Sequence, residues 1–180
     1  APVVFHKPLA DEWVRKILVK RVPRPDSEMT DSHERWAWKI MASSAVKVSS
    51  NLPEVPVTRI VRVQIHAGDR DTILTNPLEL MWRHRIPMLA PGTLVTVTVT
   101  TERPDDVVAL MHQDGRRFMH PNGDNTYTGS WYVPTGVGLR HLGINALARG
   151  TVFDDRSPYS SEAWLWMVGV RDGGTSAVLH

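Results

Sequence analysis

The chain has 180 residues, of which 42% are hydrophobic and 22% are charged, a composition typical of a globular domain rather than of a disordered or membrane-embedded chain. It contains no cysteine, which excludes disulfides, thiolate metal sites and cysteine nucleophiles. Its formal net charge is only +2 and no long apolar run is present, so we expect neither a nucleic-acid partner nor a membrane-spanning segment.

The distribution of lysine and glycine divides the chain near Asn51–Pro56. All five lysines precede residue 50, and the first glycine is Gly68. We therefore expect an N-terminal extension over residues 1–56, a folded domain over 57–172 and a tail over 173–180. Because the chain starts at Ala1, we also expect that an initiator methionine or a leader was removed.

The first predicted element spans Leu9–Val22. Leu9, Trp13 and Ile17 recur every four residues, which favours a short amphipathic helix. The β-branched residues of Lys16–Val22 leave a strand as the alternative. The following Pro23-Arg24-Pro25-Asp26 cannot continue a helix and predicts a turn.

A second helix is predicted from about Ser32 to Val46. Asp31-Ser32-His33-Glu34 has the pattern of a capping box, and Trp36 and Ile40 would form one apolar face. The alternation of Trp36, Trp38 and Ile40 is equally typical of a half-buried strand, so this alternative stays open as well.

From Val57 onward the hydrophobic period changes to two, which predicts strands. Short turn sequences rich in glycine, proline and aspartate separate them. About seven strands without intervening helices indicate an antiparallel sandwich with Val95, Val97, Val99, Trp131, Ile144 and Val168 in its core. The predicted strands are Val57–His66, Leu80–Ile86, Thr93–Thr101, Asp106–His112, Thr126–Val133, Leu139–Ala148 and Ala163–Val170.

Three stretches, Ala90–Val99, Tyr127–Pro134 and His141–Ala146, resemble bacterial immunoglobulin-like (Ig-like) domains over about residues 57–171. The chain departs from antibody-type domains because it lacks their cysteine pair. The resemblance implies a mainly β, Ig-like β-sandwich that serves adhesion, scaffolding or carbohydrate contact more often than catalysis.

Motifs for catalysis and cofactor binding are weak. The eight histidines show no metal-ligand spacing, and Gly136-Val137-Gly138 lacks the context of a dinucleotide loop, so we expect no metal and no cofactor. Ser130 and His141 with Asp154 or Asp155 could form a nucleophilic triad, but Ser130 is not in an elbow motif. A small Ser/His hydrolase is therefore only the third hypothesis, and we expect the protein not to be an enzyme.

Seven tryptophans are unusual for this length and point to interaction surfaces. In the last predicted strand Ala163, Leu165 and Met167 make the second face apolar too, so the N-terminal segments or a partner protein must cover it. A carbohydrate-binding or adhesion module is the second hypothesis, with Trp131, Tyr132 and Tyr159 as its stacking platforms.

The first hypothesis is an accessory subunit that docks onto a larger, membrane-bound assembly, for example a respiratory or photosynthetic-type complex. We expect it at the bacterial cell envelope, peripheral to the membrane, with the side left open. The expected partner-binding residues are Trp13, Val14, Ile17, Leu18, Trp36 and Ile40. Weak contact with anionic lipid is expected from Lys16, Lys20, Arg21 and Arg24.

Overall fold

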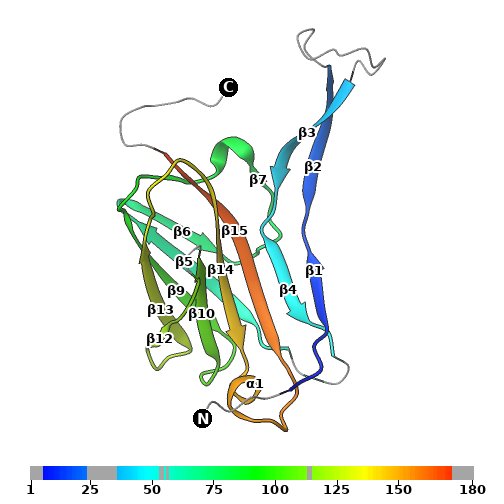
Figure 1. Cartoon of the computed structure of the whole chain (residues 1–180), viewed down its shortest axis with the longest axis vertical. Helices are drawn as coiled ribbons and strands as arrows, with labels where there is room; N and C mark the ends of the chain where they lie inside the picture. Colours follow the sequence, from blue (N-terminus) through cyan, green and yellow to red (C-terminus); the bar gives the residue numbers. More distant parts are fainter. Residues whose placement is uncertain (1–5, 24–35, 53–54, 56, 113–114, 172–180) are drawn as a thin grey trace.

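The computed structural model describes residues 6–23, 36–52, 55, 57–112 and 115–171, which form a mainly β fold (Figure 1). The strands belong to three sheets and pair antiparallel, except that β8 (Met88–Leu89) pairs parallel with β15 (Ser161–Val170). Within these residues the helical elements are α1 (Arg149–Phe153) and a 3₁₀ turn, η2 (Arg83–Arg85).

The largest sheet has seven strands and includes β15 at its centre. Its order is β1–β4–β15–β14–β10–β11, with β8 attached to β15. The remaining bounds are β1 (Asp11–Val14), β4 (Val46–Ser50), β14 (Gly138–Leu147), β10 (Val107–His112) and β11 (Gly115–Phe118).

A five-stranded sheet faces the seven-stranded one, and together they form the body of the molecule. Its order is β12–β13–β9–β5–β6. The bounds are β12 (His120–Pro121), β13 (Thr126–Tyr132), β9 (Leu94–Thr101), β5 (Ile60–Ala67) and β6 (Arg70–Leu74).

One hydrophobic core lies between these two sheets. It combines inward-facing residues of β5, β9 and β13 with those of β10, β14 and β15. All six predicted core residues, Val95, Val97, Val99, Trp131, Ile144 and Val168, are buried there. The period-two pattern of the sequence therefore identified the correct face of these strands, because successive side chains of a strand point to opposite sides.

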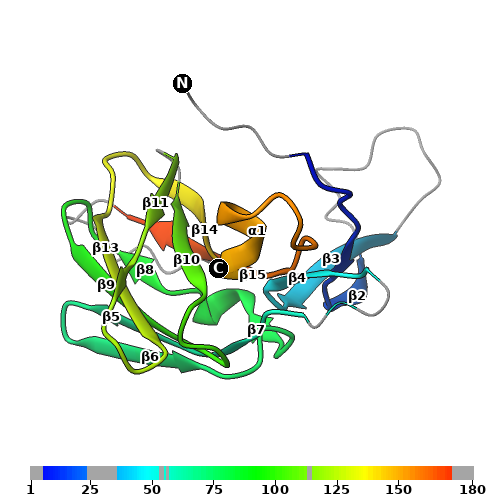
Figure 2. The ribbon, with the colours of Figure 1, turned by 90° about the horizontal axis from the view of Figure 1, so that it is seen from below.

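The third sheet contains β2 (Ile17–Pro23), β3 (Trp36–Ser43) and β7 (Met81–Trp82) in the order β2–β3–β7. We call β2 and β3 the arm. The arm diverges from the body in Figure 1, and Figure 2 shows it to one side, with β7 between it and the body.

The point of divergence is held by hydrogen bonds at Ser44, a buried residue between β3 and β4. The Ser44 amide donates to the Lys16 carbonyl at 2.9 Å, and the Ser44 hydroxyl accepts from the Lys16 amide at 2.9 Å. Beyond this point β4 pairs with β15, whereas β3 pairs with β7. One long hairpin thus contributes to two sheets.

The two predicted N-terminal helices are wrong, and the strand alternatives are what the structure contains. Leu9–Val22 forms β1 and β2, and the described part of Ser32–Val46 forms β3. The β-branched residues of β2 favour the pleated conformation, and cross-strand pairing supplies the backbone hydrogen bonds that a helix would have made internally. Arg24 and the capping-box residues Asp31–Glu34 lie outside the described residues.

Two further expectations need correction. β1 and β4 precede the boundary predicted near Asn51–Pro56, yet they pair into the seven-stranded sheet, so residues before the boundary contribute to the body. The strand predicted at Leu80–Ile86 is reduced to β7 and the turn η2, because Pro87 and the exposed Arg83–Arg85 end the ladder.

Candidate functional site

The arm carries an exposed apolar surface on one of its two faces. In the β2–β3 register Val19 lies opposite Ile40, and Pro23 lies opposite Trp36. Residues that lie opposite each other share a face, as do residues two apart along a strand. Ile17, Val19, Trp36, Trp38 and Ile40 therefore share one surface, which we call the arm face, and their exposed fractions run from 45% to 72%.

The charge of the arm is entirely positive over its described residues. Residues 17–23 and 36–43 include three cations, Lys20, Arg21 and Lys39, and no acidic residue. The Arg21 guanidinium lies 5.3 Å from the centre of the Trp36 ring, within the range of a cation–π interaction. An apolar surface beside cations suits a partner that is apolar and anionic.

The structure brings together three of the six predicted partner-binding residues on the arm face: Ile17, Trp36 and Ile40. Trp13 is 67% exposed but lies on β1 of the seven-stranded sheet. Leu18 lies on the opposite face of the arm, opposite the buried Ala42, and Val14 is half-buried on β1.

The helical pattern missed two residues of the arm face, Val19 and Trp38. Trp38, which is 72% exposed, is the most exposed of the arm-face residues. The strand alternatives would have identified these residues. Trp38, for example, lies between Trp36 and Ile40 in the period-two alternation.

An apolar groove of about 730 Å³ lies between the arm, β7 and the outer face of the seven-stranded sheet. Four methionines line it, from β3, β7, β8 and β15. We call it the methionine groove. Its other apolar lining residues include Trp13, Trp38, Ile40, Leu139 and Leu165.

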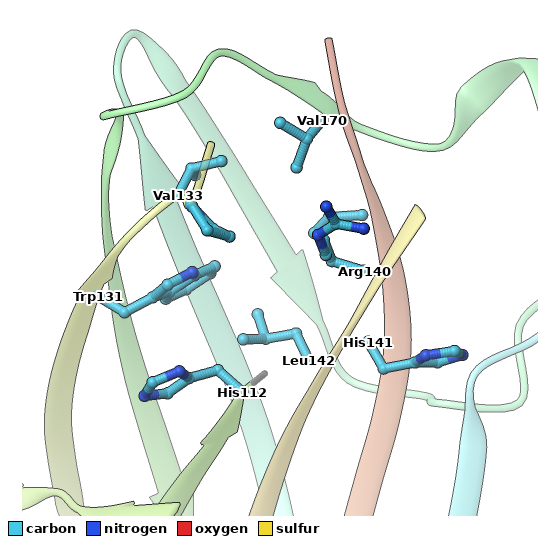
Figure 3. Close-up of a pocket in the computed structure, with 9 residues that line it drawn as sticks. His112, Trp131, Val133, Arg140, His141, Leu142 and Val170 are labelled. Carbon is cyan, nitrogen blue, oxygen red and sulfur yellow. The ribbon is translucent and has the colours of Figure 1, made fainter. Parts of the chain in front are cut away.

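A second, much smaller cavity lies inside the body (Figure 3). It measures about 10 Å³ and is bordered by Trp131, Leu142 and Arg140. The Arg140 guanidinium donates to the carbonyls of Leu139 and Gly136, each at 3.2 Å. This space holds at most about one water molecule, so we assign it to packing rather than to ligand binding.

The predicted carbohydrate platform is not assembled. Trp131 is only 7% exposed and faces the core, so it cannot stack on a sugar. Tyr132 follows it on β13 and is exposed on the other face, whereas Tyr159 is half-buried and its hydroxyl lies 2.6 Å from the Ser161 hydroxyl. These three side chains do not share a surface.

The residues of the hypothetical hydrolase are also separated. Ser130 lies opposite Thr96 on the outer face of the five-stranded sheet, and His141 lies opposite Met167 on the outer face of the seven-stranded sheet. The two side chains therefore point away from the body in opposite directions.

The acids of that hypothetical triad do not join them. Asp154 accepts hydrogen bonds from the Ser157 hydroxyl and the Arg156 amide within its own loop, and the Ser157 bond is the main cause that lowers the pKa of Asp154. Asp155 is exposed in the same loop.

Among the described residues, two acidic side chains are buried in the body, and we assign both a structural role. Glu162 accepts hydrogen bonds from the Trp164 indole at 2.7 Å and from the Ile60 amide at 3.3 Å, and it forms an ion pair with Lys47 at 3.1 Å. Since Ile60 belongs to β5, Glu162 connects the two sheets. Asp106 is 5% exposed, and burial raises its pKa to about 6.

Over the described ranges, no three histidine, aspartate or glutamate side chains are grouped so that they could hold a metal ion. The helices of this part of the chain are too short to cross a membrane. In comparisons with known proteins, no family, no curated protein and no solved structure matches this chain.

Proposed function

We propose that this protein is a non-enzymatic accessory subunit that docks onto a larger assembly through its arm face. The observation that supports this most is the arm face itself, which leaves two tryptophans and three β-branched residues exposed on a projecting hairpin. Tryptophan is enriched among the residues that dominate binding energy at protein interfaces. The cost of exposing these side chains to water is recovered when a partner covers them.

The edge of the arm offers a second means of attachment. Among the described strands, β2 is the outermost of its sheet and pairs only with β3. An unpaired edge can accept a strand from another protein, and the main-chain hydrogen bonds then add to the burial of the arm face. Exposed Lys20 on β2 discourages indiscriminate pairing of such an edge.

The body would act as the scaffold that holds the arm. Two mainly antiparallel sheets around one core support an Ig-like assignment for it, as the sequence resemblance implies. We further propose a membrane-bound assembly of the bacterial envelope as the partner. The exposed Lys16, Lys20 and Arg21 would then lie near anionic lipid and add electrostatic attraction.

Two double variants of the full chain test this function. Trp38→Ser with Ile40→Ser removes the centre of the arm face, and Ile73→Ser with Leu94→Ser removes two exposed apolar residues of the five-stranded sheet as a matched control. Each would be tagged and produced in the native source in place of the wild-type chain.

We expect the wild type and the control to co-purify with one defined complex. The arm variant should recover at least 90% less of that complex, because truncating a buried anchor residue typically costs about 1–3 kcal/mol of binding free energy. Circular dichroism would show whether all three chains keep their β structure. A folded arm variant that recovers the complex in full would contradict the proposal.

A further inference from the structure

The methionine groove has the size and lining of a ligand site. Its volume of about 730 Å³ lies within the roughly 300–1,000 Å³ of typical small-molecule pockets. The floor consists of Leu165 and Met167 from β15 and Leu139 from β14, on the outer face of the seven-stranded sheet. The body leaves this apolar floor open, and β3 and β7 supply the facing wall.

Apart from His141 and three cations at its border, the lining has few polar side chains. The hydroxyl of Ser44 donates to the Ala45 carbonyl at 2.6 Å, and the hydroxyl of Ser43 donates to the Ser44 carbonyl at 3.0 Å. Methionine side chains are flexible and polarizable, so they adapt to irregular apolar shapes. These features favour a hydrocarbon chain over a sugar or a nucleotide.

The charged lining residues are all cationic. Arg15, Lys39 and Arg83 border the groove, and none of its lining residues is acidic. The Arg15 Nε donates to the Ser43 hydroxyl at 2.8 Å, which holds its guanidinium beside the groove. Because planar guanidinium groups match carboxylate and phosphate oxygens, this border selects an anionic group.

We infer that the methionine groove binds a single acyl chain that carries an anionic headgroup. The chain lies along Leu139, Leu165 and Met167, and the headgroup lies at the cationic border of the groove. This site does not depend on the proposed partner, although Trp38 and Ile40 belong to both the groove and the arm face. An occupied groove would therefore change the surface that the arm offers.

The probe is monomeric dodecanoate, used below its micelle-forming concentration with the full-length protein in isothermal titration calorimetry. We expect saturable binding with one site per chain. From octanoate to dodecanoate, each added methylene should tighten binding roughly fourfold while the groove still covers it. Dodecyltrimethylammonium, with the same chain length and a cationic head, should bind at least about tenfold more weakly.

Two glutamate variants at equally exposed positions locate the site. Leu139→Glu places an acid on the floor of the groove, whereas Ile73→Glu places one on β6, and both wild-type side chains are 54% exposed. We expect Leu139→Glu to weaken dodecanoate binding at least about tenfold and Ile73→Glu to leave it unchanged. Arg83→Glu, at an exposed position in η2, keeps the test decisive if Leu139→Glu does not fold.

Three results would overturn the inference. These are the absence of saturable binding to monomeric dodecanoate, equal affinity for the anionic and cationic amphiphiles, and equal effects of Leu139→Glu and Ile73→Glu. Binding to phosphatidylglycerol vesicles without binding to monomeric dodecanoate would assign the lipid contact to a bilayer surface and reject the groove. Because this test involves no partner protein, its failure leaves the docking proposal untouched.

Discussion

Replacing Asp106 by Asn should stabilise the protein at neutral pH. Asp106 is 5% exposed and precedes β10, and burial is the largest influence on its carboxyl group, with a smaller opposing effect of the Thr101 hydroxyl. Burial disfavours the charged form, so the pKa rises from 3.8 to about 6. Asn has nearly the same shape but no charge, and it therefore avoids the desolvation of a carboxylate.

The size and sign of the effect follow from the linkage between protonation and folding. Between pH 4 and pH 6 the folded state holds a proton that the unfolded state has released, so this group makes stability fall as the pH rises through that window. The rise in pKa corresponds to about 3 kcal/mol at most, at 1.36 kcal/mol per pH unit. The stability difference between Asp106→Asn and wild type should therefore grow by about 1–3 kcal/mol between pH 4 and pH 7.

Urea denaturation at several pH values would measure this difference, with the exposed Asp155→Asn as the control for a lost surface carboxylate. The control should change stability by less than about 0.5 kcal/mol at every pH. A difference that stays constant from pH 4 to pH 7 would refute the raised pKa of Asp106. A difference that shrinks with pH would show that the carboxylate is stabilised in the folded state.

Three further perturbations test the body of the fold. Val97→Asp should cost more than about 3 kcal/mol, because Val97 is fully buried in β9, and an unchanged Tm would place it elsewhere. Glu162→Leu should lower the free energy of unfolding in urea by about 2–4 kcal/mol, because it leaves the Trp164 indole without its hydrogen-bond acceptor. Glu162→Gln should lower it less, and equal losses for the two variants would contradict this role of Glu162. A chain that starts at Leu52 lacks β1 and β4 and should aggregate in size-exclusion chromatography, because the edge of β15 is left unpaired; a stable, monodisperse product would show that these strands are dispensable.

The sequence could predict the buried side of β5, β9, β10, β13, β14 and β15 because each of these strands has one face in the core. The alternation of Val95, Val97 and Val99 with threonine determines which side chains are buried, whatever the neighbouring strands are. The conformation of the N-terminal segments was harder to predict, because neither face of the arm is buried along its length and Ala42 is its one buried residue among those described. Apolar residues at positions 9, 13 and 17 also fit a helix, and only the pairing of β1 with β4 and of β2 with β3 decides against it.

Because the N-terminal segments fitted both a helix and a strand, the sequence predicted only some of the arm-face residues. The sequence singled out Trp36 and Ile40 as candidate partner-binding residues, and the structure leaves both exposed on the arm face, but only the strand conformation shows that Trp38 lies on the same face. Nothing in the local sequence relates Leu139 and Leu165 to Met81, since these residues come from three separate strands. The methionine groove therefore had no sequence signal of its own.

The sequence by itself determined the absence of cysteine chemistry, the mainly β class and the core-facing positions, because composition and side-chain periodicity are local properties. Only the tertiary structure decided that one N-terminal hairpin divides at Ser44 between the body and the arm. It also decided that Ser130 and His141 lie on opposite outer faces. The physical reason is that strand pairing and sheet packing are set by contacts between residues far apart in the chain, which no local pattern records.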